Sequence, residues 1–317
     1  MKKLRVLLSL LTVVVLLTGC SGAERLMFGT GGTAGTYYAY GGVISQYITN
    51  NANVKVTAVS SGGSKANVQS IQDGDFQLGF VQSDVMAYAW QGTKSFEKDG
   101  PVHEFRVLGG LYDETVQLFT MDENIKSVED LRGKSVSIGE AGSGVYFNAI
   151  DVLTAAGITL DDIYPQYQSF EASKEAMKDG KIQAAFVVAG APTTAITELA
   201  TTNGVFLVNI EGDLREKIIA SCPYYSPLQI PADTYPGQPE PVETITVKAT
   251  VIVSAALDED TVYRMTAAIF DNAESIAAEN AKGKELSIVN ATTGMTAPFH
   301  SGAARYYKEH GIEVETD

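Results

Sequence analysis

The chain has 317 residues, of which 45% are hydrophobic and 19% are charged, so it can bury a substantial core and is long enough for two domains. It carries 38 acidic residues against 23 basic ones, and this formal net charge of −15 argues against a nucleic-acid partner. Its two cysteines, Cys20 and Cys222, are too few for a disulfide framework.

The N-terminus predicts a signal peptide over residues 1–19. Lys2, Lys3 and Arg5 form a basic segment, and the apolar run that follows is too short to span a bilayer. The small residues before Cys20 resemble the lipobox of bacterial lipoproteins, which implies cleavage before this cysteine and a lipid on its thiol. An ordinary signal peptide followed by a chance cysteine is the alternative. Cleavage would leave 20 basic residues against 38 acidic ones, a formal charge of −18.

A turn rich in glycine and threonine, residues 30–36, separates a predicted strand at 26–28 from a predicted helix. Apolar residues spaced by three and four positions, from Tyr40 to Ile48, predict the buried face of that helix. Glycines let a backbone approach a ligand closely, and the first N–H groups of a helix are unpaired and favour an anion. The turn therefore predicts a binding site for a small ligand.

Two nucleotide motifs and a plain turn are the alternatives for this segment. Gly29, Gly31 and Ala34 nearly fit the dinucleotide motif G-x-G-x-x-G, but Ser60 and Ser61 stand where its ribose-binding acid is needed. A P-loop requires a lysine after its last glycine, and no glycine here is followed by lysine in that pattern. A tight turn without a ligand explains less well why residues 30–36 include three glycines and three threonines.

The next two predicted strands also end in polar turns that lead into helices. Residues 54–59 precede a turn with Ser61 and Ser64, and residues 76–81 precede Gln82 and Ser83, with Ser83 or Asp84 as the predicted helix N-cap. Ligands of open α/β sheets bind outside the carboxyl ends of the strands. We therefore expect the three turns to lie together at one edge of a parallel sheet.

The middle of the chain repeats this arrangement. We predict that a strand at 106–112 ends the first lobe and that a separate strand at 116–120 begins a second. A strand at 135–139 and a helix at 145–156 flank a turn of small residues, and a strand at 182–188 precedes a second such turn, with Pro192 in the first turn of the next helix. Residues 127–134 predict a short helix with a capping box.

The last third of the chain begins with residues 223–241, which contain six prolines and are predicted to be an irregular connector. Residues 243–254 predict the strand that returns the chain to the first lobe, and residues 258–280 predict one long amphipathic helix. The chain would thus cross between lobes twice, near 112–116 and near 241–246, and two crossings predict a hinge.

The sequence contains no recognisable catalytic or metal-binding set. Its three histidines are scattered, no zinc-type spacing is present, and Cys222 has no histidine near it in the sequence, so we interpret it as a small buried hydrophobic residue. No catalytic residue, metal or cofactor is expected. A secreted hydrolase that uses Ser64 or Ser143 remains an alternative.

Six segments together resemble one family, the TAXI solute receptors of tripartite ATP-independent periplasmic (TRAP) transporters. The segments occur in the expected order over nearly all of the mature chain, and the string T-G-G-T-A-G-T-Y-Y at 30–38 is the most specific of them. One departure is Ser301, where the family pattern has proline. The other segments are 62–64, 81–84, 130–134 with 142–144, 188–192 and 300–307.

The resemblance implies an α/β periplasmic-binding fold of two lobes, each a mainly parallel sheet flanked by helices, with the ligand in the cleft between them. Lobe 1 would comprise residues 20–112 and 245–317, and lobe 2 residues 113–244. The protein would be a monomeric, non-enzymatic lipoprotein outside the cytoplasm, anchored to the membrane through Cys20. It would deliver glutamate, glutamine or a related dicarboxylate such as 2-oxoglutarate to a TRAP permease; a binding lipoprotein of an ATP-driven importer is the alternative.

The predicted turns contain no arginine, so a ligand carboxylate would meet backbone N–H groups and hydroxyls. Asp84 would either accept a hydrogen bond from an α-amino group or cap its helix. The predicted ligand-binding residues are Thr30, Gly31, Gly32, Thr33, Gly35, Thr36, Tyr37, Ser61, Gly63, Ser64, Gln82, Ser83, Gly142, Ser143, Gly144, Val145, Ala189, Gly190 and Ala191.

Overall fold

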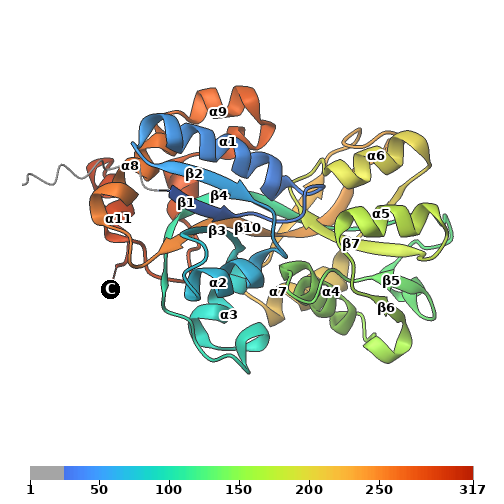
Figure 1. The fold of residues 1–317 in the computed structure, drawn as a ribbon. Helices are drawn as coiled ribbons and strands as arrows, with labels where there is room; N and C mark the ends of the chain where they lie inside the picture. The colour runs from blue at the N-terminus through green and yellow to red at the C-terminus, as the bar shows by residue number, and fades with distance from the viewer. Residues whose placement is uncertain (1–24, 317) are drawn as a thin grey trace, which may run out of the picture.

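The structure, a computed structural model, describes residues 25–316. These residues form two α/β lobes joined by two long strands that run through the middle of the molecule (Figure 1). The predicted signal peptide and Cys20 lie outside the described residues. The described strands form one 10-stranded sheet, in which eight follow the order β2-β1-β3-β10-β4-β7-β5-β6, while β8 pairs with β4 and β9 with β10.

Lobe 1 is built on three parallel strands that alternate with helices, as the sequence predicts. The first two strands each end in a turn that leads into the next helix, whereas the third runs directly into its helix, so the turn predicted at Gln82 and Ser83 is absent. The three helix starts lie at one edge of the sheet. The strands are β1 (Arg25–Gly29), β2 (Lys55–Val59) and β3 (Leu78–Gln82), and the helices are α1 (Thr36–Asn51), α2 (Ser64–Gln72) and α3 (Ser83–Gln91), followed by the 3₁₀ helix η1 (Lys94–Phe96).

Lobe 2 repeats this architecture with short parallel strands and helices on both sides (Figure 1). The predicted capping box of Ser127 and Asp130 is confirmed at the start of a 3₁₀ helix. The strands are β5 (Ser135–Ser137), β6 (Tyr164–Gln166), β7 (Ala184–Ala189), β8 (Phe206–Val208) and β9 (Ser226–Ile230), and the helices are η2 (Val128–Leu131), α4 (Gly144–Ala155), η3 (Leu160–Asp162), α5 (Phe170–Lys178), α6 (Thr194–Thr202) and α7 (Gly212–Ser221).

The two strands predicted on either side of residue 114 are one continuous strand, β4 (Phe105–Thr120), so that prediction was wrong. β4 pairs antiparallel with β10 (Val242–Ser254), and Thr115 lies opposite Thr246. The polar residues 113–115 interrupt the apolar pattern, but their backbone pairing with β10 keeps them in the strand. The predicted lobe boundaries therefore fall inside two paired strands, and the predicted crossings lie side by side.

Three other predictions need correction. The proline-rich segment contains β9, and Pro227 is tolerated there because β9 is an edge strand that pairs only with β10. Pro192 precedes Thr193, the N-cap of α6, and so lies outside that helix. The N-cap of α3 is Gln82, one residue before Ser83, because Ser83 already begins the helix.

The predicted long helix at 258–280 is two helices, α8 (Glu259–Phe270) and α9 (Ala273–Glu279). The break follows Asp271, which accepts a hydrogen bond from the Tyr306 hydroxyl at 2.6 Å. This tertiary contact fixes the position of the segment between the two helices. Asp258 is the N-cap of α8, since its side chain accepts from the Thr261 N–H at 2.9 Å. The remaining helices, η4 (Ala281–Glu285), α10 (Ile288–Thr292) and α11 (Ser301–Glu309), belong to lobe 1, where α11 packs against α8.

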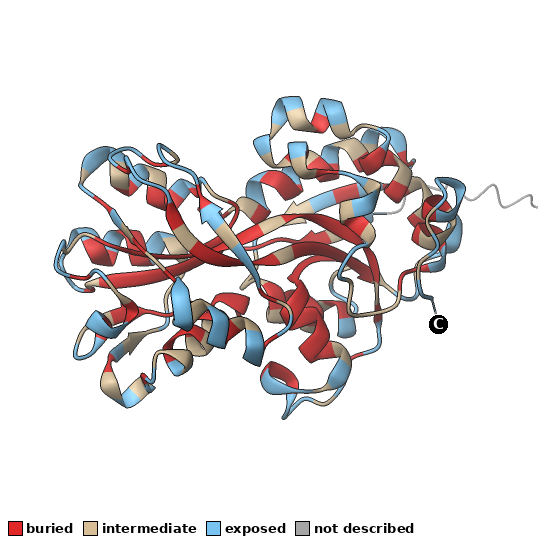
Figure 2. Ribbon diagram, turned by 180° about the vertical axis from the view of Figure 1, so that it is seen from behind, coloured by how far each residue is buried: buried red, intermediate tan, exposed pale blue. Residues whose placement is uncertain are grey.

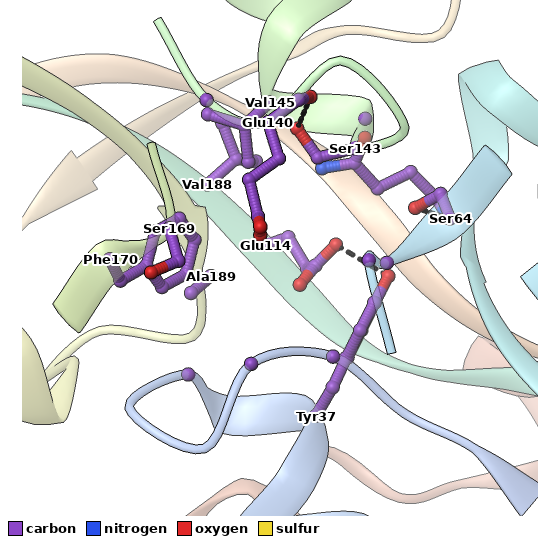
Figure 3. Close-up of a pocket in the computed structure, with 18 of the residues that line it drawn as sticks. Tyr37, Ser64, Glu114, Glu140, Ser143, Val145, Ser169, Phe170, Val188 and Ala189 are labelled. Carbon is purple, nitrogen blue, oxygen red and sulfur yellow. Dashed lines mark hydrogen bonds between the residues drawn. The ribbon is translucent and has the colours of Figure 1, made fainter. Parts of the chain in front are cut away.

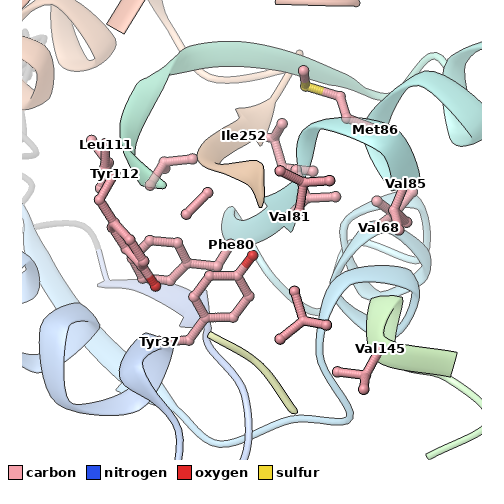
Figure 4. Close-up of a cluster of buried hydrophobic side chains, with 14 of the residues drawn as sticks. Tyr37, Val68, Phe80, Val81, Val85, Met86, Leu111, Tyr112, Val145 and Ile252 are labelled. Atoms are coloured by element: carbon pink, nitrogen blue, oxygen red, sulfur yellow. The ribbon is translucent and has the colours of Figure 1, made fainter. Parts of the chain in front are cut away.

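Buried residues follow the strands through both lobes, while the outer faces of the helices are exposed (Figure 2). Aromatic packing fixes the start of α1 on the sheet. The Phe80 ring stacks on Tyr37 at a centroid distance of 4.4 Å (Figure 4) and also on Phe28 at 4.9 Å. This stack holds the first turn of α1 against β3 and directs the Tyr37 hydroxyl toward the space between the lobes.

Candidate functional site

A pocket lies between the two lobes at the ends of their strands (Figure 3). The space between its lining atoms is about 540 Å³ with the open mouth included. Lobes 1 and 2 both contribute to its lining. The predicted site residues among its lining are Gly31, Gly32, Gly35, Thr36, Tyr37, Gly63, Ser64, Gln82, Ser143, Gly144, Val145 and Ala189.

Two predicted hydroxyls of lobe 1 hold the turns together and are not in the pocket lining. Thr30 is fully buried, and its Oγ1 donates to the Val59 carbonyl at 2.6 Å. Ser61 Oγ donates to the Thr30 carbonyl at 3.1 Å and accepts from the Gly63 N–H at 3.1 Å. These bonds fix the first two turns against each other. Thr33 and Ser61 line a neighbouring hollow.

Four more predicted residues lie beside the pocket, outside its lining. Ser83 Oγ accepts from the Lys248 N–H at 3.1 Å, which ties α3 to β10. The Gly142 carbonyl accepts from the Ala66 N–H at 3.3 Å, and the Gly190 carbonyl accepts from Thr36 Oγ1 at 3.1 Å. Both of these bonds join lobe 1 to lobe 2. Ala191 follows Gly190 in the same turn.

The α4 N-terminus of lobe 2 lies directly against the turns of lobe 1. Ser143 is its N-cap: its Oγ accepts from the Tyr146 N–H and donates to the Glu140 carbonyl at 2.7 Å. A Cβ added to Gly144 would collide with the Gln82 side chain and lie 3.1 Å from Ser64 Oγ. A larger residue here would have to displace the Gln82 side chain, so the two lobes approach closely at this point and the described structure is a closed arrangement.

Sequence reasoning missed several lining residues. Ser169 and Phe170 stand at the start of α5, after a strand that ends at Gln166, so the strand–turn–helix pattern recognised elsewhere would have found them. Glu114 was placed in a connector between strands, and an acidic residue between two apolar runs was its only signal. The missed lining residues are Gly62, Glu114, Gly139, Glu140, Gln168, Ser169, Phe170 and Val188.

Glu114 is the most buried charged side chain of the pocket lining, with 2% of its surface exposed. Its Oε2 accepts a hydrogen bond from the Tyr37 hydroxyl at 2.8 Å (Figure 3). Burial raises the pKa of Glu114 to about 8, although the bonds from Tyr37 and Gln82 act in the opposite direction. Burial and the neighbouring Glu114 charge raise the pKa of Tyr37 well above its usual range, so Tyr37 remains a neutral donor.

The pocket lining contains two carboxylates and no lysine, arginine or histidine. Glu140, the second carboxylate, is half-buried, and burial raises its pKa. The absence of arginine agrees with the sequence expectation, whereas the two acids were not foreseen. Donors to a ligand anion would come from the N–H groups at the starts of α1, α2 and α4 and from the Ser64 hydroxyl.

Asp84 does not contact the pocket and does not cap its helix through its side chain. It is fully buried and accepts from Asn148 Nδ2 of lobe 2 at 2.9 Å. Asn148 also donates to the Tyr225 hydroxyl at 2.8 Å, which in turn donates to Asp151 at 3.0 Å. Lys94 of lobe 1 completes this interlobe network through an ion pair with Asp151 at 3.1 Å.

Cys222 is buried as predicted, with its Sγ 3.2 Å from the Tyr88 hydroxyl, and burial raises its pKa and disfavours a reactive thiolate. Residues 25–316 contain no cluster of histidine, cysteine and acidic side chains suited to a metal ion. No helix in the same range has both the length and the apolar character needed to cross a bilayer.

Two α/β lobes, joined by paired strands and enclosing a pocket at their strand ends, define the periplasmic-binding-protein fold. The chain belongs to the NMT1-like family, whose profile matches residues 28–311.

Solved structures of binding proteins share the fold at low sequence identity. The alkanesulfonate-binding protein SsuA from Xanthomonas axonopodis pv. citri, bound to MOPS, is 14% identical over 91% of this chain and 92% of its own, with a TM-score of 0.50. An ancestral arginine-binding protein bound to arginine is 14% identical over 83% and 99%, with a TM-score of 0.52. The GluR0 ligand-binding core from Nostoc punctiforme, in complex with L-glutamate, is 15% identical over 82% and 100%, with a TM-score of 0.50.

Proposed function

We propose that this protein is an extracytoplasmic solute-binding lipoprotein of the TAXI type. It captures a small anionic metabolite and delivers it to the permease of a TRAP transporter, without chemical change to the solute. The observation that carries the proposal is the pocket between the lobes, which the helix-starting turns of both lobes line. Membership of the NMT1-like family and the periplasmic-binding fold support it.

The proposed ligands are glutamate, glutamine and related dicarboxylates such as 2-oxoglutarate. A carboxylate in the pocket would accept from the N–H groups at the starts of α1, α2 and α4. Each hydrogen bond to a charged group contributes about 1.5–3 kcal/mol, so several of them replace the missing arginine. MOPS, arginine and glutamate, the ligands of the three similar structures, each carry an acidic group.

A lipid on Cys20 would hold the receptor close to the membrane. Four residues lie between Cys20 and Arg25, the first residue of β1. At about 3.3–3.6 Å per extended residue, the lobes would lie within roughly 20 Å of the bilayer, near a permease. We expect Cys20→Ala to abolish labelling by a fatty-acid analogue and to leave precursor or released protein. Labelling that persists in this variant would contradict the lipid anchor.

The proposed function predicts that glutamate, glutamine or 2-oxoglutarate raises the melting temperature of the purified protein and that neutral sugars do not. Ligand at about 100 times its Kd adds about 2.7 kcal/mol to the free energy of unfolding. Ser143→Ala should reduce the shift, because it removes the N-cap that fixes the start of α4. Ser301→Ala, on an exposed residue of α11, is the matched control and should leave the shift unchanged.

Other outcomes would contradict parts of this assignment. Stabilisation by sugars but by no acid would contradict an anion site. Turnover of a bound metabolite would contradict a non-enzymatic receptor. A neighbouring gene for an ATPase, in place of a large polytopic permease, would assign the receptor to an ATP-driven importer.

A further inference from the structure

We infer that Glu114 and Gln82 form an acceptor site for the ammonium group of an α-amino acid, so that the pocket selects amino acids over keto diacids. This inference rests on the proposed function and narrows its ligand class. It starts from two acceptors in the pocket lining, one of which has no hydrogen-bond partner.

The first acceptor is the Glu114 carboxylate in the middle of β4. The Tyr37 hydroxyl orients it through a bond of 2.8 Å, and the stack of Tyr37 on Phe80 fixes that hydroxyl. The carboxylate is therefore held in place by Tyr37 while it lines the pocket.

The second acceptor is Gln82 Oε1, which is buried and has no hydrogen-bond partner. Gln82 is 2% exposed and lies in the pocket lining next to Gly144. A buried carbonyl oxygen without a donor costs about 1–3 kcal/mol, which a ligand donor would recover. An ammonium group has three N–H donors, so it can serve Gln82 Oε1 and the Glu114 carboxylate together.

Among the described residues, no ion pair stabilises the ionised form of Glu114. Tyr37 is a neutral donor, Tyr112 is neutral, and Asp84 of α3 is a further acid whose charge opposes ionisation of Glu114. Lys282 of η4 is the one basic group among these neighbours, and it pairs with Glu285 at 2.7 Å. A ligand ammonium would supply the missing positive charge.

Proton release would accompany this mode of binding. Burial holds the pKa of Glu114 at about 8, so its carboxyl is largely protonated in the unliganded pocket at pH 6–7. An ammonium favours the ionised form, and the affinity should therefore rise with pH, by up to about tenfold per pH unit, until about pH 8. A keto diacid has no ammonium, so its binding should not follow this trend.

The experiment is isothermal titration of the purified protein with L-glutamate, L-glutamine and 2-oxoglutarate at pH 6 and pH 8, in two buffers of different ionisation enthalpy. We expect both amino acids to bind at least tenfold more tightly at pH 8 than at pH 6. They should also bind more tightly than 2-oxoglutarate and release a proton at pH 7.

Substitutions test the Glu114 carboxylate separately from the Tyr37 hydroxyl that orients it. Glu114→Gln should weaken amino-acid binding at least tenfold and remove its pH dependence. Because Gln is a neutral residue of the same shape, it avoids the cost of a buried charge and should fold. Tyr37→Phe, which removes only the orienting hydroxyl, should cause a smaller loss. Glu274→Gln, on an exposed residue of α9, is the matched control and should bind like the wild type.

Three results would overturn the inference, and they show whether the proposed function fails with it. Tighter binding of 2-oxoglutarate than of the amino acids, or an unchanged preference in Glu114→Gln, would overturn the ammonium site and leave the proposed function in place. Failure of all three ligands to bind would overturn the inference together with the anionic ligand class of the proposed function.

Discussion

Asp84 of α3 and Glu114 of β4 are two buried carboxylates, and their surroundings separate their roles. Glu114 lines the pocket and accepts from Tyr37 of α1. Asp84 is bonded across the cleft to Asn148, and its Oδ1 has no partner. Burial raises the pKa of Asp84 to about 7. One acid therefore faces the ligand space, whereas the other links the lobes.

The raised pKa of Asp84 predicts a pH dependence of stability. Because its folded-state pKa lies above its value of about 3.9 in unfolded chains, its contribution to stability is present below that value and is lost as the pH rises to 7. Asp84→Asn lacks this dependence. The free energy of unfolding of the variant relative to the wild type should rise by about 1.4 kcal/mol per pH unit between pH 4 and 7.

Denaturant unfolding at pH 4, 5, 6, 7 and 8 measures this difference. It should be smallest at pH 4, where the protonated carboxyl resembles the amide, and constant above pH 7. Asp75→Asn, on an exposed residue of lobe 1, is the matched control and should show no trend. A difference for Asp84→Asn that does not change with pH would contradict a raised pKa at this position.

The recurring element of this protein is a strand, a turn of small residues and a helix whose first N–H groups face the cleft. In lobe 1 it occurs at the start of α1 and α2, and in lobe 2 at the start of α4. The small residues serve close approach between the lobes as well as space for a ligand. Gly144 of α4 faces Gln82 and Ser64, and Gly190 faces Thr36 and Lys282.

Gly144→Ala tests this close approach. The added methyl group would collide with Gln82 and hold the lobes apart, so we expect ligand affinity to fall at least tenfold. Stability of the unliganded protein should change little, because alanine is a better helix former than glycine. Titration calorimetry and thermal unfolding measure the two quantities.

Gly42→Ala in α1 is the control for this substitution. Nothing lies within 4 Å of a Cβ at this exposed position, so affinity should be unchanged while stability rises by up to about 1 kcal/mol. Wild-type affinity in Gly144→Ala would mean that the lobes close without this contact.

At the scale of the whole molecule, β4 and β10 are the two connections on which relative motion of the lobes would depend. We propose that lobe 1 comprises residues 20–112 and 245–317 and lobe 2 residues 113–244, with the hinge where Thr115 pairs with Thr246. Across the cleft, the lobes are joined by a few polar contacts, such as Thr36 to Gly190 and Asn148 to Asp84. A few polar bonds can break and re-form, so opening about the hinge is feasible.

A ligand that contacts both lobes should favour the closed arrangement. Small-angle scattering should therefore show a smaller radius of gyration with saturating L-glutamate than without it. A neutral sugar at the same concentration is the control and should leave the radius unchanged. An equal radius with and without a ligand whose binding is established by calorimetry would contradict hinge closure.

The local pattern of the sequence was sufficient for the architecture. Alternation of short apolar runs with helical spacing predicted the α/β class, and each turn of lobe 1 lies where a strand was predicted to end. The burial of Tyr40, Ile44 and Ile48 follows the predicted face of α1. These features depend on neighbours within about ten residues, which is the range that spacing and helix capping describe.

The tertiary structure alone decided which polar residues face the ligand space. Glu114 interrupts an apolar pattern and was predicted to lie in a connector, but pairing of β4 with β10 and β7 makes it the middle of a buried strand. Thr30 and Ser83 stand in the predicted turns, yet their hydroxyls are used by Val59 and Lys248. Partners that are distant in sequence determine these outcomes, because a hydroxyl or carboxylate is available to a ligand only when no such partner already engages it.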